Sequence, residues 1–213
     1  MDCCQCQGIE GMFNQREAKR SLKTYRRKGP ARSTRILLDA LRAQGVESAT
    51  LLDIGGGIGA IQLNLLDAGV TSATDVDAST AYLEAAREEA AREGFADRVT
   101  YHHGNFVDLA PSITPADIVT LDRVICCYHD LRGLVSSSAS KAQRLYGLVY
   151  PRDSWLTAAL AGGINLFMRL QRSPFRFFPH RNRDVEALLH AAGLQRRFHG
   201  ATGIWQVAVY ARA

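Results

Sequence analysis

The stretch LLDIGGGIGA, Leu51 to Ala60, decides the fold of this chain. It begins as a strand-like apolar run and breaks into a glycine-rich turn that leads into a helical pattern. Such a turn lets the backbone approach a nucleotide-bearing ligand closely, because glycine puts no side chain in the way. Two large classes of cofactor enzyme use turns of this kind, one moving hydrides and the other moving methyl groups.

The charge around this turn helps to choose between the two classes. Residues 55–60 fit the pattern G-x-G-x-x-G/A, and Asp77 lies 20 residues beyond Gly57, so an NAD-binding oxidoreductase stays possible. The segment 43–86 contains no Lys or Arg, but it contains six acidic residues, namely Glu47, Asp53, Asp67, Asp75, Asp77 and Glu84. A dinucleotide brings an anionic pyrophosphate, whereas S-adenosylmethionine has no phosphate and carries a cationic sulfonium. The acidic segment favours the cation, although helix amides could still hold a pyrophosphate.

Hydrophobic periodicity predicts one α/β domain around the turn. Helices are expected at 14–28 and 33–44, and strands then alternate with helices, which predicts βαβ units and a parallel sheet. The expected strands are 49–54, 72–76, 99–103, 117–121, 145–150, 194–199 and 204–211, and the further helices are 60–68, 79–93, 134–144, 155–170 and 182–192. The link GATG between the last two strands suits an antiparallel hairpin at the end of the sheet.

The residues around the turn resemble a known family. LLDIGGGIG is similar to the D/E-x-G-x-G-x-G signature of the class I S-adenosylmethionine-dependent methyltransferases, with Asp53, Gly55, Gly57 and Gly59 in the four defining places. TDVDAS resembles the second strand of the family, where Asp77 would bind the ribose hydroxyls. The resemblance implies a Rossmann-like fold with a mainly parallel seven-stranded sheet, and S-adenosyl-L-methionine as cofactor.

The resemblance continues downstream in the same order. RVTYHHGNFVDL resembles the third strand and its adenine-contacting turn, with Asn105 where the family usually has Asp; an Asn carbonyl can still accept from the adenine amino group. ADIVTLDRVICCY resembles the fourth strand, whose end at Asp122 would border the methyl donor, and RLYGLVYPRDSW resembles the fifth.

Charge and length suggest the domain organisation. The 213 residues carry a net charge of +5, distributed as +5 over residues 1–50, −6 over 51–150 and +6 over 151–213. We expect a basic helical cap at 1–48 and a methyltransferase domain at 49–213, with an apolar and basic insertion at about 151–183. An acidic centre between basic flanks can offer two electrostatic environments to two ligands.

Targeting and cysteine patterns indicate a cytoplasmic protein with reduced thiols. The N-terminal residues lack the basic start and apolar run of a signal peptide, and no run is long enough for a spanning helix. The five cysteines are Cys3, Cys4, Cys6, Cys126 and Cys127, which is not the spaced set of a disulfide framework. They also lack the second pair that a closed zinc site needs, so no metal is expected. The role of the first three, and the oligomeric state, cannot be read from the sequence.

The catalytic candidates follow the fourth strand, because ligands gather at the carboxyl ends of strands in open α/β sheets. These candidates are Asp122, Arg123, Tyr128 and His129, with Arg123 placed on the substrate. His129 is the preferred general base for an acceptor that must lose a proton, and a surface histidine is the equally weighted alternative. Tyr25 shares a helical stripe with Leu22, so it is either a core residue or a substrate contact.

The segment 151–183 supplies the remaining substrate candidates, Trp155, Arg172, Arg176 and Phe177. It joins the apolar run WLTAALAGGINLFMRL to the Arg- and Phe-rich run QRSPFRFFPHRNR. One interpretation is a lid over a large, apolar, anionic small molecule; the other is a buried helix followed by a basic loop. This region and LDRVICCY also resemble the magnesium-protoporphyrin IX methyltransferase branch, whose acceptor is a porphyrin carboxylate.

Two other functional classes remain open from the sequence. Arginines between aromatics also suit RNA, but the chain lacks the N/D-P-P-Y/F/W motif of nucleic-acid methyltransferases after the fourth strand, so RNA ranks below a small molecule. An apolar helix flanked by arginines could instead place a non-enzymatic protein in peripheral contact with anionic lipid.

Overall fold

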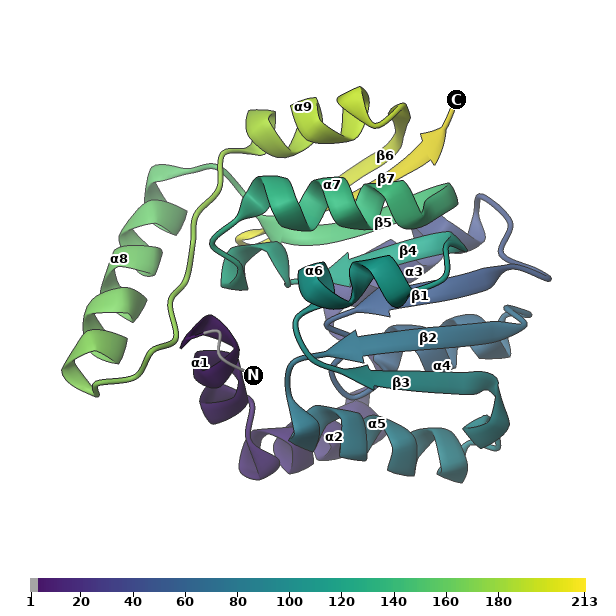
Figure 1. The fold of residues 1–213 in the computed structure, drawn as a ribbon, viewed down its shortest axis with the longest axis horizontal. Coiled ribbons are helices and arrows are strands. Elements are labelled where there is room, and N and C mark those ends of the chain that lie inside the picture. The colour runs from purple at the N-terminus through teal and green to yellow at the C-terminus, as the bar shows by residue number, and fades with distance from the viewer. Residues whose placement is uncertain (1–3) are drawn as a thin grey trace.

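The computed structural model describes residues 4–213, with side chains from residue 8 onward. It contains a seven-stranded sheet in the order β3-β2-β1-β4-β5-β7-β6, in which β5–β7 and β7–β6 are antiparallel and the other neighbours parallel. Helices lie on both faces of this sheet (Figure 1). The expected Rossmann-like fold with an antiparallel C-terminal hairpin is therefore confirmed.

The elements follow the expected alternation. The strands are β1 (Thr50–Ile54), β2 (Ser72–Asp77), β3 (Val99–His103), β4 (Ala116–Asp122), β5 (Ala142–Pro151), β6 (Leu194–Thr202) and β7 (Trp205–Arg212). The helices are α1 (Cys4–Met12), α2 (Gln15–Lys28), α3 (Arg32–Arg42), α4 (Ala60–Asp67), α5 (Thr80–Arg92), α6 (Phe106–Leu109), α7 (Leu131–Lys141), α8 (Trp155–Leu170) and α9 (Asn182–Ala191).

Helix α3 is part of the central core. Leu37, Leu38 and Leu41 on one face of the helix are buried against strand residues such as Leu51 and Leu145. Helix α2 contributes Ala18 and Leu22 to a smaller cluster with Ala81 and Ala85 of α5. Apolar residues repeating every three or four positions thus place α3 against the sheet and α2 against α5, and the core continues across residue 48.

Three local differences from the sequence expectation have simple causes. Helix α7 ends at Lys141, so residues 142–144 belong to β5; Ala142 pairs with Ala116 of β4 and extends the ladder. The last hairpin turns at Gly203, whose φ of 56° suits a tight turn, while 200–202 pair within β6. Helix α1 was not predicted, because its short run has little amphipathic pattern of its own. Cys3 lies outside the described residues, as do the side chains of Cys4 and Cys6.

Helix α8 has the expected bounds but not the burial that one interpretation required. Only Thr157 and Ala161 of its sixteen residues are buried. Trp155, Leu166 and Leu170 are among its exposed residues, and the helix stands beyond the carboxyl ends of the parallel strands (Figure 1). The interpretation of 155–170 as a buried helix is therefore wrong.

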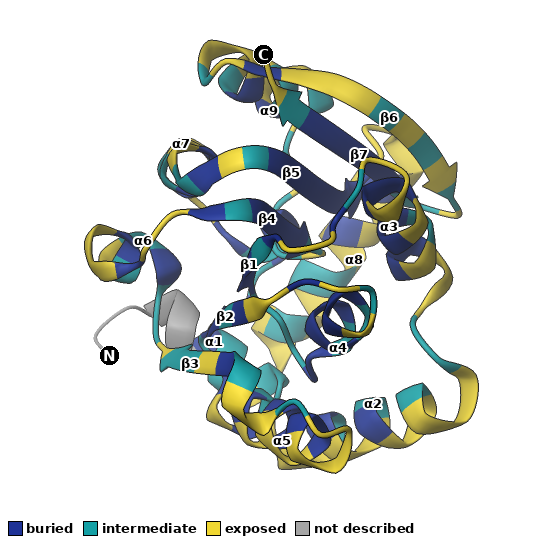
Figure 2. Cartoon of the chain, turned by 90° about the vertical axis from the view of Figure 1, so that its right-hand side faces the viewer, coloured by how far each residue is buried: buried dark blue, intermediate teal, exposed yellow. Residues whose placement is uncertain are grey.

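The buried core sits on both faces of the sheet, as Figure 2 shows by the dark strands between lighter helices. Strands β1 and β4 are central in the order and almost entirely buried. The carboxyl ends of β1 and β4 therefore lie side by side. From β1 the strand order runs outward to β2 and β3, and from β4 it runs the other way to β5, so this is the topological switch point at which open α/β sheets bind ligands. No helix within residues 4–213 is long and apolar enough to cross a membrane.

Candidate functional site

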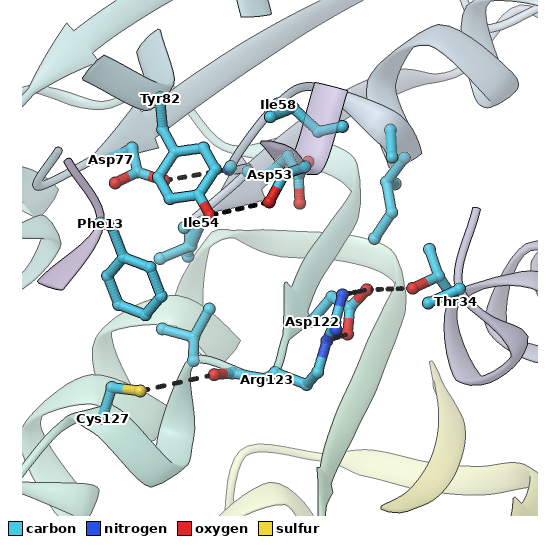
Figure 3. A pocket seen from close by; sticks show the side chains of 18 of the residues that line it. Phe13, Thr34, Asp53, Ile54, Ile58, Asp77, Tyr82, Asp122, Arg123 and Cys127 are labelled. Atoms are coloured by element: carbon cyan, nitrogen blue, oxygen red, sulfur yellow. Dashed lines mark hydrogen bonds and ion pairs between the residues drawn. The ribbon is translucent and has the colours of Figure 1, made fainter. Parts of the chain in front are cut away.

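A cavity of about 780 Å³ opens at the carboxyl ends of the parallel strands (Figure 3). Its floor is the turn 53–61 after β1, and its walls come from the ends of β2 and β4. Helices α1, α2 and α3 close one side, and residues 175 and 177 of the segment after α8 close another. The sequence segments expected to hold a cofactor and an acceptor thus share one cavity.

The glycine turn has a backbone that only glycine adopts easily. Gly55, Gly57 and Gly59 have φ values of 65°, 60° and 79°. Gly56 has no positive φ, but a Cβ there would lie 2.3 Å from Nε2 of Gln62 and 2.6 Å from Oδ1 of Asp75. Either the backbone conformation or close packing therefore requires glycine at each of these four positions. The turn packs directly over the buried side chains of Gln62 and Asp75.

Asp53 lies beneath this turn and is buried. Thr120 donates to its Oδ1 at 2.7 Å, and Gln62 donates to its Oδ2 at 3.2 Å. Burial raises the pKa of Asp53 to about 7, although these two hydrogen bonds oppose the rise. Asp53 therefore connects the end of β1 to β4 and α4 beneath the turn.

Asp77 ends β2 and ties the turn to the next helix. The amide of Gly57 donates to its Oδ2 at 3.0 Å, and the amide of Ser79 donates to its Oδ1 at 2.8 Å. Burial raises the pKa of Asp77, and the hydrogen bonds from these amides oppose that effect. Each carboxylate oxygen has a further lone pair, so Asp77 can still accept from a ligand hydroxyl.

A third carboxyl group, Asp75, lies beside the other two. It is fully buried, and neither of its oxygens has a donor in hydrogen-bonding geometry among the described residues. Burial raises the pKa of Asp75 well above its usual value, and the Asp77 and Asp53 carboxylates raise it further. The Gln62 side chain and the Gly56 amide lie close enough to oppose that rise, although neither meets the geometry of a hydrogen bond. Three neighbouring acids without a Lys or Arg partner form a region that suits a cationic ligand.

Asn105 lines the cavity where the sequence placed it, at the end of β3. Its Oδ1 accepts from the amide of Val107 at 3.3 Å, and its Nδ2 donates to Asp108 at 2.9 Å. The side chain therefore caps α6, and Oδ1 keeps a lone pair for a second donor.

Asp122 lies at the other side of the floor, at the end of β4. Thr34 of α3 donates to its Oδ2 at 2.5 Å, and Arg123 Nε lies 2.9 Å from its Oδ1. Arg123 has a φ of 63°, an unfavourable value for a residue with a side chain, and its guanidinium lies over the cavity floor (Figure 3). The strand end thus holds a charge pair at the cavity, where sequence reasoning placed Asp122 and Arg123.

The other residues expected after β4 divide between the cavity and its outside. Tyr128 lines the cavity and is buried. His129 is exposed, stacks on the Tyr128 ring with 5.4 Å between centroids, and is not among the lining residues. The preferred general base is therefore not brought to the cavity.

Only some of the substrate candidates line the cavity. Phe177 lines the cavity, and Tyr25 lines its edge, where its hydroxyl accepts from Asn64 at 3.0 Å. Trp155, Arg172 and Arg176 are not lining residues, and Nη1 of Arg176 donates to the carbonyls of Ser173 and Phe175 at 2.6 Å each. The arginines of this segment are thus turned away from the cavity.

Apart from Arg123, the positive charge at the cavity comes from the N-terminal helices. Side chains of α2 and α3 form a basic rim, namely Arg20, Lys28, Arg32 and Arg35. The glycine turn supplies acidic residues to the cavity floor, and the helices supply basic residues to its rim. The acidic and basic segments of the sequence therefore line the same cavity.

The comparison with known families decides between hydride and methyl transfer. Residues 51–142, which include the glycine turn, Asp77, Asn105 and Asp122, match the family model described as a methyltransferase domain. Residues 51–142 of the chain therefore form a methyltransferase domain. The match supports methyl transfer and not the NAD-binding alternative. No curated protein matches the chain.

Solved structures of methyltransferases have the same fold as this methyltransferase. Magnesium protoporphyrin IX methyltransferase from Synechocystis PCC 6803, with bound SAH, is 16% identical with a TM-score of 0.75 over 98% of this chain and 100% of that one. An O-methyltransferase family protein from Burkholderia thailandensis is 19% identical with a TM-score of 0.72, over 96% and 62% of the two chains. Geranyl diphosphate C-methyltransferase from Streptomyces coelicolor A3(2) is 15% identical with a TM-score of 0.67, over 84% and 78%.

Sequence reasoning missed the residues of this methyltransferase that reach the cavity from α1 and α5. The ring of Phe13, just after α1, lies 5.5 Å from that of Tyr82 and 6.1 Å from that of Phe175, centroid to centroid. The Phe13 carbonyl accepts from the Ser79 hydroxyl at 2.6 Å. No motif marks these residues, because their contacts join segments more than 60 positions apart and only the tertiary fold creates them.

Proposed function

We propose that this enzyme transfers the methyl group of S-adenosylmethionine to a carboxylate oxygen of an apolar, anionic small molecule. The observation that carries the proposal is the polarity of one cavity, with carboxyl groups at the glycine turn, apolar walls and a basic rim. S-adenosylmethionine supplies a methyl group on a positively charged sulfur, which an acceptor atom displaces in line.

The acidic half fits the cofactor. Asp77 has lone pairs for the ribose hydroxyls, and Asn105 has one for the adenine amino group. A cation above the turn would favour ionisation of the buried carboxyl groups of Asp53 and Asp75, whose pKa values burial raises, whereas a pyrophosphate would oppose it. We propose that Gly55, Gly57 and Gly59 form the backbone surface on which the cofactor rests.

The other half fits an apolar anion. Phe13, Phe175 and Phe177 supply apolar walls, and the basic rim supplies cations for a carboxylate. The negative charge of segment 51–150 would repel an anionic acceptor, which would be directed to the basic rim.

The lining residues also suit an acceptor that needs no general base. No histidine lines the cavity among the residues that the structure describes. A carboxylic acid is already ionised near neutral pH, so its oxygen can attack without losing a proton to the protein. A hydroxyl or amine acceptor would need a base, for which Asp122 is the nearest candidate. We therefore favour a carboxylate, of which a porphyrin propionate is one example.

The test compares acceptors and rim variants. We expect a labelled methyl group to pass to apolar carboxylic acids, including protoporphyrin, and not to their methyl esters. The double variant Arg32→Gln/Arg35→Gln should raise KM for the acid severalfold with little change in kcat, because the rim binds ground state and transition state alike. The control is Arg16→Gln/Arg27→Gln, which changes exposed arginines of α2 that do not line the cavity. Label that appears only in an RNA fraction would overturn the proposal.

A further inference from the structure

Helix α8 is attached to the body of the protein along one narrow stripe. Thr157 and Ala161 are its buried residues, four positions apart. Further along the same stripe, Nδ2 of Asn165 donates to the carbonyl of Phe177 at 2.8 Å, and the amide of Phe177 donates to Oδ1 of Asn165 at 2.7 Å. Residues spaced by four lie on one side of a helix, so the rest of the circumference faces away from the body.

The outward side of α8 is apolar. We call it the apolar face, and it consists of Trp155, Leu156, Leu160, Leu166, Phe167 and Leu170. These six are all the exposed large hydrophobic side chains in the described part of the chain, and Trp155 and Leu170 are 81% and 75% exposed. Scattered exposed hydrophobics are ordinary, but all of them gathered on one helix mark an interaction site.

The charges of α8 and of the segment that returns from it are of one sign. Between Ser154 and Arg183 there is no acidic residue, while five arginines occur, namely Arg169, Arg172, Arg176, Arg181 and Arg183. Arg169 and Arg172 are exposed at the C-terminal end of the helix, and Arg181 is exposed where the returning segment ends. An apolar surface with cations at its edge complements an anionic lipid surface, where acyl chains lie beneath negative headgroups.

The length of the helix fixes how it would meet a bilayer. Sixteen residues span about 24 Å at 1.5 Å per residue, less than the hydrocarbon thickness. Its body-facing stripe is also hydrogen-bonded to Phe177, so the helix cannot be surrounded by lipid. It can lie flat in the headgroup region, with Trp155 at one end in the position that this residue favours at membrane interfaces.

The helix also borders the cavity. Ala161 packs in one cluster with Cys126 and Phe177, and both of those residues line the cavity. The segment that returns from α8 carries Phe175, which contacts Phe13 across the cavity. The apolar face therefore belongs to a helix that stands at the wall of the cavity and not in a remote part of the protein.

We propose that α8 docks this enzyme on the surface of an anionic lipid bilayer, with the apolar face in the interface and the arginines of residues 169–183 at the headgroups. A bilayer accounts for both the apolar residues and the one-signed charge. A second copy of the chain would bring the same arginines together at a symmetric contact, which is unfavourable without acidic partners. The inference does not depend on which acceptor is methylated.

The experiment is flotation of the full chain with vesicles of phosphatidylcholine mixed with phosphatidylglycerol, and with vesicles of phosphatidylcholine alone. We expect binding to the anionic vesicles, much weaker binding to the neutral ones, and weakening by salt. Leu166→Ser/Phe167→Ser/Leu170→Ser should lower the vesicle partition coefficient at least tenfold. The matched control Ala158→Ser/Ala159→Ser changes exposed small residues of the same helix and should bind like the parent.

A charge variant separates the two parts of the proposal. Arg169→Gln/Arg181→Gln should lose binding to anionic vesicles severalfold while leaving the weak binding to neutral ones unchanged. Trp155 fluorescence should shift to shorter wavelength on binding, and Trp155→Phe should remove that shift and leave only the signal of Trp205. Unchanged affinity for S-adenosylhomocysteine shows that each variant is folded.

Three results would overturn the proposal. The first is parent protein that floats with neither vesicle type, and the second is a triple serine variant that floats like the parent. The third is a dimer in sedimentation velocity that the triple variant abolishes, with no vesicle binding, which would assign the apolar face to a second copy of the chain.

Discussion

Asp53 and Asp75 are paired residues on the adjacent parallel strands β1 and β2, and both carboxyl groups are buried. Thr120 and Gln62 donate to Asp53, whereas Asp75 has no donor in hydrogen-bonding geometry among the described residues. Gly56 closes over the pair, since a Cβ at that position would lie within 3 Å of both side chains. The glycine turn therefore packs on two buried acidic side chains, and their burial opposes folding when they are ionised.

The acidic pair predicts that stability falls as pH rises. The pKa of Asp53 rises from 3.8 to about 7 on folding, so the folded state binds more protons than the unfolded state between these values. The free energy of unfolding then decreases with rising pH across that window. We expect Asp75→Asn to raise the free energy of unfolding by roughly 1–3 kcal/mol near pH 8, and by less near pH 5.

The measurement is thermal or urea unfolding at both pH values, with Asp67→Asn as the control for removing one exposed carboxylate. An equal effect of Asp75→Asn at both pH values would contradict the linkage.

Asp77→Ala should weaken binding of S-adenosylhomocysteine by roughly 10- to 100-fold, the equivalent of about 1.5–3 kcal/mol for hydrogen bonds to a charged group. The loss has two parts, because Asp77 is proposed to accept from the ribose and also holds the amide of Gly57. Calorimetry measures the affinity, and an unfolding curve shows whether the fold is kept. Parental affinity in the folded variant would remove Asp77 from the cofactor site.

The sequence predicted the parts of the site that depend on local pattern. Asp53, Asp77 and Asp122 end or adjoin strands whose period and spacing are visible in the chain, and all three line the cavity. Phe13 and Thr34 could not be found this way, since each reaches the cavity through helix packing. For the same reason, the sequence did not show which residues of the segment after residue 151 reach the cavity.

That segment shows what composition alone leaves undecided. Arginines and aromatics at 155–177 were assigned to the substrate, but the sequence does not say which side of α8 faces the body. The structure turns Trp155 outward and brings Phe177 inward, and the basic side chains of the rim come from α2 and α3. Composition therefore did not identify the segment that supplies the basic side chains at the cavity.

Gly56→Ala should destabilise the protein and abolish cofactor binding. The added methyl group would meet Nε2 of Gln62 at 2.3 Å, in a region where Asp53 and Asp75 leave no room to move. Gly163→Ala is the matched control, because a Cβ there meets nothing within 4 Å and sits inside a helix. It should raise the free energy of unfolding by roughly 0.5–1 kcal/mol. Similar stability of the two variants would show that the turn is less tightly packed than its contacts indicate.

The last prediction distinguishes the contributions of Asp122 and His129 to catalysis. His129 is exposed and does not line the cavity, so His129→Ala should keep near-parental kcat and KM. Asp122 lies at the cavity floor and accepts from Thr34, so Asp122→Asn should lower kcat. Thr34→Val removes only that hydrogen bond and should lower kcat less than Asp122→Asn does.

The pH profile tells which role Asp122 has. If Asp122 only positions Arg123, as expected for a carboxylate acceptor, then Asp122→Asn lowers kcat by a constant factor across the pH range. If Asp122 removes a proton from a hydroxyl or amine acceptor, the variant loses the acidic limb of the profile together with its rate. The second outcome would overturn the carboxylate proposal, and a large loss of kcat in His129→Ala would return the base to the residue that the sequence favoured.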